Sequence, residues 1–177
     1  MKSTAFAMVG ARPGDHVLFL GVPDKADAAL AAEVAETTGL NGRTVVVDVG
    51  TEARDRTESA ATKGGSLVEF EWAPVTMLPM DGGTFDIAVI NRQLVNLDGR
   101  NRVACCEEAL RVVKPRGRVV VIEGLRRPGL FGLLPTRIPG LPAEESRAAL
   151  VAAGAGAARQ LAEVDGVLYL EALTANR

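Results

Sequence analysis

Few residues of this 177-residue chain could do acid–base, nucleophilic or metal chemistry. His16 is the only histidine, and it stands at the start of a predicted strand. Cys105 and Cys106 are neighbours within a helical pattern and lack the spacing of metal ligands, so we expect inert, buried thiols in a reducing compartment. Tyr169, the only tyrosine, falls in a predicted hairpin, where packing is its expected role. The sequence therefore predicts no metal site, and it leaves the catalytic residues unknown.

Strand and helix patterns alternate along the chain, and these elements must position any functional side chain. Short apolar or β-branched runs predict strands, the first of them buried on both faces, over 16–20, 44–47, 66–72, 85–90 and 118–123. Composition and apolar spacing predict helices over 24–38, 51–63, 102–113 and 144–153. Asp24 is the expected N-cap of the first helix and Gly39 its expected stop.

This alternation predicts an α/β fold: a Rossmann-like, doubly wound, mostly parallel sheet with helices on both faces. Residues 158–164 and 167–173 flank Asp165-Gly166, a two-residue turn signal that predicts a C-terminal antiparallel hairpin. A dinucleotide-binding Rossmann domain would more often continue with parallel crossovers. The length, with no repeat or linker, predicts a single domain over residues 1–177.

Charge and hydropathy exclude several classes of partner. The net charge is -2 at pH 7, so no broad basic surface predicts binding to nucleic acid or to an anionic membrane. The N-terminal apolar run is too short for a signal peptide or a membrane span. We therefore expect a cytoplasmic protein without membrane insertion.

Four stretches resemble the class I S-adenosylmethionine (SAM) methyltransferases, especially the ubiquinone/menaquinone-biosynthesis-like group called type 11. Residues 12–18 resemble the family's approach to its first strand, and 78–86 its approach to the fourth. Residues 108–118 resemble the helix and turn before the fifth strand, and 152–154 the start of the C-terminal hairpin region. The resemblance implies the class I methyltransferase fold, SAM as cofactor and a small-molecule substrate, with a lipophilic one as an option.

The resemblance also implies three cofactor-binding residues, each at the end of a predicted strand. Gly21 is the one retained glycine of the family's glycine-rich loop, Asp48 matches the acid that accepts the ribose hydroxyls, and Asn91 lies over the methyl-transfer region. Each has a structural alternative. The Gly21 loop could simply be a turn that caps the next helix, Asp48 a solvated strand end, and Asn91 a residue that orients backbone.

The same loop departs from the family pattern at several positions. Phe19 replaces a carboxylate, and Pro23 replaces a glycine with a residue that has no N–H and a fixed φ. Lys25 brings a cation that would repel the sulfonium of SAM if it pointed inward. Pro74 stands where the family often has an aspartate that meets the adenine. The degenerate loop leaves SAM binding open.

The segment Gly124–Pro142 stands where the family usually builds its substrate cover. It combines prolines and glycines with an apolar centre and flanking arginines. It could be a lid over a lipophilic or anionic substrate, a homodimer contact, or a loop that packs over the sheet edge.

Three functions compete on this basis. The first is a SAM-dependent methyltransferase with an unusual cofactor loop. The second is a non-catalytic homologue that has lost SAM and serves as a partner subunit or binds another ligand. The third is an NAD(P)-linked enzyme, which is weakest because Gly21 has no second and third glycine at dinucleotide spacing.

Overall fold

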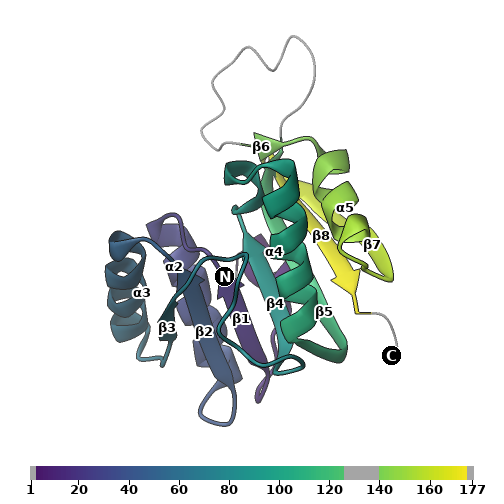
Figure 1. Ribbon diagram of the computed structural model, residues 1–177. Helices are drawn as coiled ribbons and strands as arrows, with labels where there is room; N and C mark the ends of the chain where they lie inside the picture. The colour runs from purple at the N-terminus through teal and green to yellow at the C-terminus, as the bar shows by residue number, and fades with distance from the viewer. Residues whose placement is uncertain (1–2, 126–139, 175–177) are drawn as a thin grey trace.

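The computed structural model describes residues 3–125 and 140–174, and its centre is one eight-stranded sheet of order β3-β2-β1-β4-β5-β8-β7, with β6 paired to β5 (Figure 1). Strands β1 to β6 pair in parallel, whereas β8 is antiparallel to both β5 and β7. The predicted fold class is confirmed. The strand bounds are β1 His16–Leu20, β2 Arg43–Asp48, β3 Glu69–Trp72, β4 Phe85–Asn91, β5 Val113–Leu125, β6 Gly140–Leu141, β7 Ala157–Val164 and β8 Val167–Leu173.

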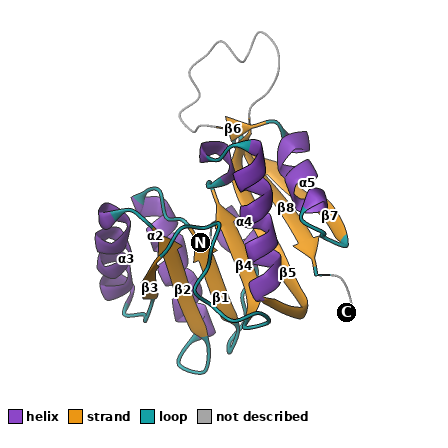
Figure 2. Cartoon of the chain, viewed as in Figure 1, coloured by secondary structure: helices purple, strands orange, loops and turns teal. Residues whose placement is uncertain are grey.

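Helices cover both faces of the sheet and create two apolar cores (Figure 2). On one face, α1 (Thr4–Val9), α2 (Lys25–Thr38) and α3 (Thr51–Gly64) pack through residues such as Val9, Val34 and Ala53. On the other face, α4 (Gly99–Val112), α5 (Ala143–Ala152) and the loop over 73–84 pack together. A short 3-10 helix, η1 (Leu94–Asn96), links β4 to α4. Both faces of the central strands are therefore buried, as was predicted for the first of them, 16–20.

Local sequence signals explain several element ends. The Asp24 side chain accepts the backbone N–H groups of Ala26 and Asp27 and so caps α2, and α2 stops at Gly39. The predicted hairpin turn is confirmed at Asp165 and Gly166, whose φ angles are 51° and 76°. Those two positive values are the ones that a two-residue turn of type I′ requires.

The structure also corrects some predicted elements. Helix α1 was not predicted, α4 begins at Gly99 rather than at 102, and β3 begins at Glu69 rather than at 66. No helix forms over 73–84, between β3 and β4. Of the segment Gly124–Pro142, residues 126–139 lie outside the described residues, so the proposed lid and dimer contact stay predictions.

Candidate functional site: a filled crevice at the strand ends

The three predicted site residues meet at the carboxyl edge of the sheet. Strand β1 lies between β2 and β4, so Gly21, Asp48 and Asn91 follow or end three adjacent strands. The chain leaves β1 toward one side and later returns on the other, which makes the β1–β4 boundary the topological switch point where such sheets bind ligands.

Gly21 is held from both sides by backbone and side-chain hydrogen bonds. Its N–H donates to the Val47 carbonyl at 2.9 Å, and its carbonyl accepts from Asn91 Nδ2 at 3.2 Å. Its φ of 88° lies in the region that favours glycine. Asn91 is fully buried, and in this structure it orients backbone.

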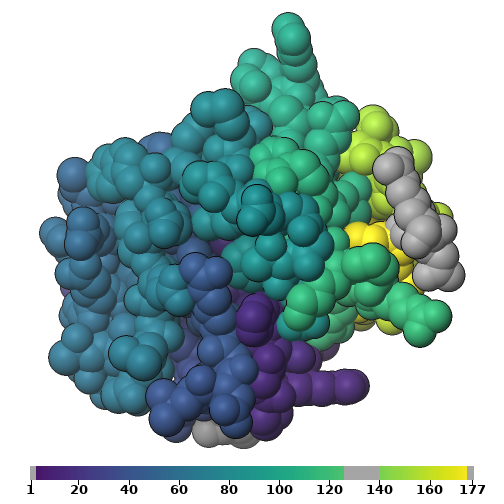
Figure 3. Space-filling view, turned by 60° about the horizontal axis from the view of Figure 1, so that its bottom comes forward, coloured from purple at the N-terminus to yellow at the C-terminus, as the bar shows by residue number. Residues whose placement is uncertain are grey.

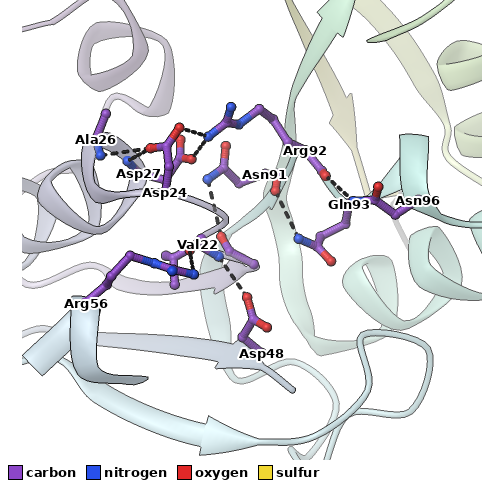
Figure 4. A network of polar contacts seen from close by, with 11 residues as sticks. Val22, Asp24, Ala26, Asp27, Asp48, Arg56, Asn91, Arg92, Gln93 and Asn96 are labelled. Carbon is purple, nitrogen blue, oxygen red and sulfur yellow. Dashed lines mark hydrogen bonds and ion pairs between the residues drawn. The ribbon is translucent and has the colours of Figure 1, made fainter. Parts of the chain in front are cut away.

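Asp48 also has structural partners. Oδ2 accepts the Val22 N–H at 3.1 Å (Figure 4), and Oδ1 accepts the Gly50 N–H at 2.9 Å. The half-buried carboxylate thereby ties the loop after β1 to the loop after β2. A carboxylate has about four lone-pair sites, so Asp48 keeps capacity to accept further donors, ribose hydroxyls included.

An ion-pair cluster spans the crevice on the β4 side. Arg92, the residue directly after β4, contacts Asp24 and Asp27 at the start of α2 through Nη2 (Figure 4). Burial raises the pKa of Asp27 despite the hydrogen bond from Arg92. Burial also opposes ionisation of Asp24, but hydrogen bonds from Arg92 and from the Asp27 backbone outweigh it and lower the pKa of Asp24. This contact joins the α2 N-terminus to the end of β4.

Gln93 occupies the space directly over Gly21. A Cβ added to Gly21 would lie 1.9 Å from Gln93 Nε2 and 2.4 Å from its Cδ, so the amide group packs against the bare backbone. Gln93 Nε2 also donates to the Asn91 carbonyl at 3.4 Å. The bare surface of Gly21 is therefore covered by the protein's own side chain.

Behind the β4 side lies Glu123, which is fully buried near the end of β5. Its Oε2 accepts the Val95 N–H at 3.3 Å and so holds η1, which follows Arg92 and Gln93 in the chain. Burial raises the pKa of Glu123 to about 7, and backbone hydrogen bonds from Val95 and Gly124 partly offset that effect. Glu123 is a positioning residue for this loop.

A family model described as a methyltransferase domain matches residues 26–117, slightly more than half of the chain. The chain belongs to this methyltransferase family. The matched span includes Asp48 and Asn91 and begins after Gly21 and the altered loop. The predicted family resemblance is therefore confirmed at the level of the class I methyltransferase superfamily.

Solved structures of low sequence identity support the same fold. A SAM-dependent methyltransferase from Aquifex aeolicus is 21% identical with a TM-score of 0.73, over 97% of this chain and 88% of that one. One from Methanosarcina mazei is 16% identical with a TM-score of 0.71, over 99% of both chains. The [4+2]-cyclase SpnF is 18% identical with a TM-score of 0.71, over 95% of this chain and 77% of that one. The search of curated proteins found no match.

The residues present fit only part of the cofactor that the methyltransferase family implies. Asp48 can accept hydroxyl donors, so the ribose side of the crevice fits SAM. The methionyl side requires bare backbone at Gly21, and Gln93 covers that backbone, while the ion pair of Arg92 with Asp27 joins the ends of β4 and α2. The arrangement described here therefore does not fit the whole of SAM.

Sequence reasoning located Gly21, Asp48 and Asn91 but missed Arg92 and Gln93. The available signal was their position directly after a buried strand, in the run Asn91-Arg92-Gln93. Lys25, in contrast, is exposed and lines a groove between α2 and α3, so its charge is not what closes the crevice.

The other residues that could do chemistry lie away from the crevice. His16 lies at the opposite end of β1, and Tyr169 is buried. Cys105 and Cys106 are buried, free thiols whose pKa values burial raises. Among the described residues no cluster of potential metal ligands is found, and no helix could cross a membrane.

Proposed function

We propose that this methyltransferase-family chain is a non-catalytic homologue that does not bind SAM in its folded state and that serves as a partner subunit or binds another ligand. The observation that carries the proposal is the Gln93 amide, which packs on Gly21 where the methionyl part of SAM would approach. Phe19 and Pro23 support it, because each removes a group that the family uses at this loop.

The contacts around Gln93 add to this support. Arg92 is held by two carboxylates, and its side chain is only 17% exposed, so moving it leaves Asp27 partly buried without a cation. Separating such a pair costs several times the thermal energy. Opening the methionyl side would thus require breaking an internal ion pair before any ligand contact forms.

Calorimetric titration with SAM and with S-adenosylhomocysteine tests the proposal. We expect no saturable heat from the wild-type protein at millimolar ligand. Saturable binding that disappears in Asp48→Ala would overturn the proposal, because it would show the ribose acid at work in an open site. Asp55→Ala, which removes an exposed carboxylate on α3, is the matched control.

A second candidate function is SAM-dependent methyl transfer to a small molecule. It is favoured by the family match over Asp48 and Asn91 and by the nature of the obstacle, since Gln93 meets Gly21 with the far end of a flexible side chain. If this candidate holds, Gln93→Ala should strengthen the binding of S-adenosylhomocysteine to a protein that already binds it.

We also propose that residues 1–177 form one domain, because every described strand joins the same sheet. We propose as well that the protein is cytoplasmic and that it forms a homodimer through the segment Gly124–Pro142.

A further inference from the structure

A second hollow lies at the amino edge of the sheet, opposite the crevice. It has a volume of about 560 Å³ and is walled by residues near Gly10–Asp15, by Asp86 and Ile87, and by Lys114–Arg118, a turn at the start of β5 where the register with β4 shifts. Figure 3 brings this edge forward, with the purple N-terminal segment beside the green start of β5. This hollow belongs to a different end of the strands from Gly21, Asp48 and Asn91.

Four cationic side chains line this hollow, and two of them have no ion-pair partner among the residues that the structure describes. Lys114 Nζ holds both Asp86 oxygens at 2.9 Å, and Arg118 pairs with Glu171 at 3.0 Å. The guanidinium groups of Arg12 and Arg116, in contrast, make no hydrogen bond or ion pair within 3–125 and 140–174.

Asp15 is the lining carboxylate that opposes this positive charge. Its Oδ2 accepts the backbone N–H of Arg12 at 2.8 Å, and Asp86 is already neutralised by Lys114. Within the described residues, two guanidinium groups without an ion-pair partner therefore face one such carboxylate, Asp15, and the hollow keeps a net positive charge.

The backbone conformation at Arg116, an exposed residue, is an unfavourable one for an arginine. Its φ is 66°, in the left-handed region that is costly for a bulky residue and natural for glycine. The next residue fixes the turn, since a Cβ on Gly117 would lie 2.5 Å from Val113 Cγ1 and 2.7 Å from the Asp86 carbonyl oxygen. An arginine thus stands on a rigid turn at a position that glycine would occupy without strain. Strained positions of this kind cluster at binding sites.

We propose that this hollow is an anion site that takes a small phosphomonoester, with Arg12 and Arg116 as its principal ligands. Guanidinium groups bind phosphate oxygens with paired, charge-assisted hydrogen bonds, and two of them match the roughly two negative charges of the ester. Lys114 and Arg118 are already paired with Asp86 and Glu171, so among the described residues the uncompensated positive charge of the wall comes from Arg12 and Arg116. The inference does not depend on whether SAM binds, because it uses the other edge of the sheet.

Amide NMR titration tests the site with two probes, inorganic phosphate and glycerol 3-phosphate, at constant ionic strength set by sodium chloride. We expect saturable shifts of the Arg116 and Gly117 amide signals with both probes and none with glycerol. Shifts that grow linearly, or that chloride reproduces, would overturn the proposal.

Two variants make the test specific. Arg116→Gly removes the guanidinium and relieves the positive φ, so it should fold at least as well as the wild type and bind phosphate about tenfold more weakly. Asp15→Asn removes the opposing charge and should tighten binding. Arg100→Ala, an exposed arginine near the start of α4, is the control and should bind like the wild type. Equal affinity in Arg116→Gly and the wild type would refute the assignment. The titration of the crevice with S-adenosylhomocysteine is expected to give the same result in all four proteins.

Discussion

The two sides of the crevice differ in what their residues do for the fold. On the β2 side, Asp48 joins two loops by accepting the Val22 and Gly50 amides, and it still has room for hydroxyl donors. On the β4 side, Arg92 and Gln93 fill the space that bare backbone would leave. A residue with an internal structural role can keep its family position whether or not a cofactor binds. Gly21 also has a structural reason to be glycine, its φ of 88°, and here Gln93 covers its bare surface. The presence of Asp48 is therefore weak evidence that SAM binds, and the position of Gln93 over Gly21 is stronger evidence that it does not.

Among the variants that test this comparison, Arg92→Ala is expected to lower the free energy of unfolding the most. Removing the cation leaves Asp27 mostly buried, with its side chain 13% exposed, and should lower the free energy of unfolding by about 3 kcal/mol. Urea denaturation at pH 7 measures the change. The double variant Arg92→Ala with Asp27→Asn should recover part of the loss. A change below about 0.5 kcal/mol would mean that the cluster does not hold the crevice closed.

The fold was largely predictable because its signals are local. Apolar runs, the Asp24 cap and the Asp165-Gly166 turn each act within a few residues. Helix α1 was missed because six residues carry too little periodicity, and Phe6 and Val9 are stabilised by distant parts of the core. Helix α4 starts early because Asp98 caps it by accepting the Asn101 N–H, which overrides the poor helix propensity of Gly99.

The site was only half predictable, for a physical reason. Asp48 and Asn91 could be found because strand ends share an edge of the sheet. The closure of the crevice depends on the backbone of Arg92, whose φ is 52°, and on the direction in which Gln93 then points. The sequence does not indicate which non-glycine residue adopts a positive φ, so it could not predict that Gln93 covers Gly21.

Glu123→Gln should give the next largest effect, and it tests how the β4 side is held. The folded pKa of about 7 lies above the usual 4.5. The carboxyl thus favours folding below pH 4.5, and that contribution is lost as the pH rises toward and through 7. We expect the variant to gain about 2 kcal/mol relative to the wild type between pH 4.5 and pH 8. Urea denaturation at both pH values measures the difference. Glu107→Gln, exposed on α4, is the control, and an equal pH profile in the variant and the wild type would contradict the assignment.

Asp48→Ala should have a smaller effect, on the β2 side. The Val22 and Gly50 amides lose their acceptor, so the free energy of unfolding should fall by about 1–2 kcal/mol with no ligand present. Thermal and urea unfolding of the ligand-free protein measure it. An unchanged free energy of unfolding would show that Asp48 has no structural role, and it would support a role for Asp48 in binding SAM.

Gln93→Ala should have the smallest effect on stability, less than about 1 kcal/mol, because the one hydrogen bond that the amide makes within the described residues is long, at 3.4 Å. It sharpens the comparison by uncovering Gly21 while leaving Asp48 in place. Binding of S-adenosylhomocysteine that appears in this variant alone would identify the amide as the obstacle. Failure of both proteins to bind would leave Arg92 and Pro23 as the remaining barriers.

The most direct measurement of the central claim is a crystal structure after soaking with S-adenosylhomocysteine. The account predicts that Gln93 stays on Gly21, that Arg92 stays paired with Asp24 and Asp27, and that no ligand density lies over β1. Density for the nucleoside with its ribose on Asp48, and with Gln93 turned away from Gly21, would contradict it.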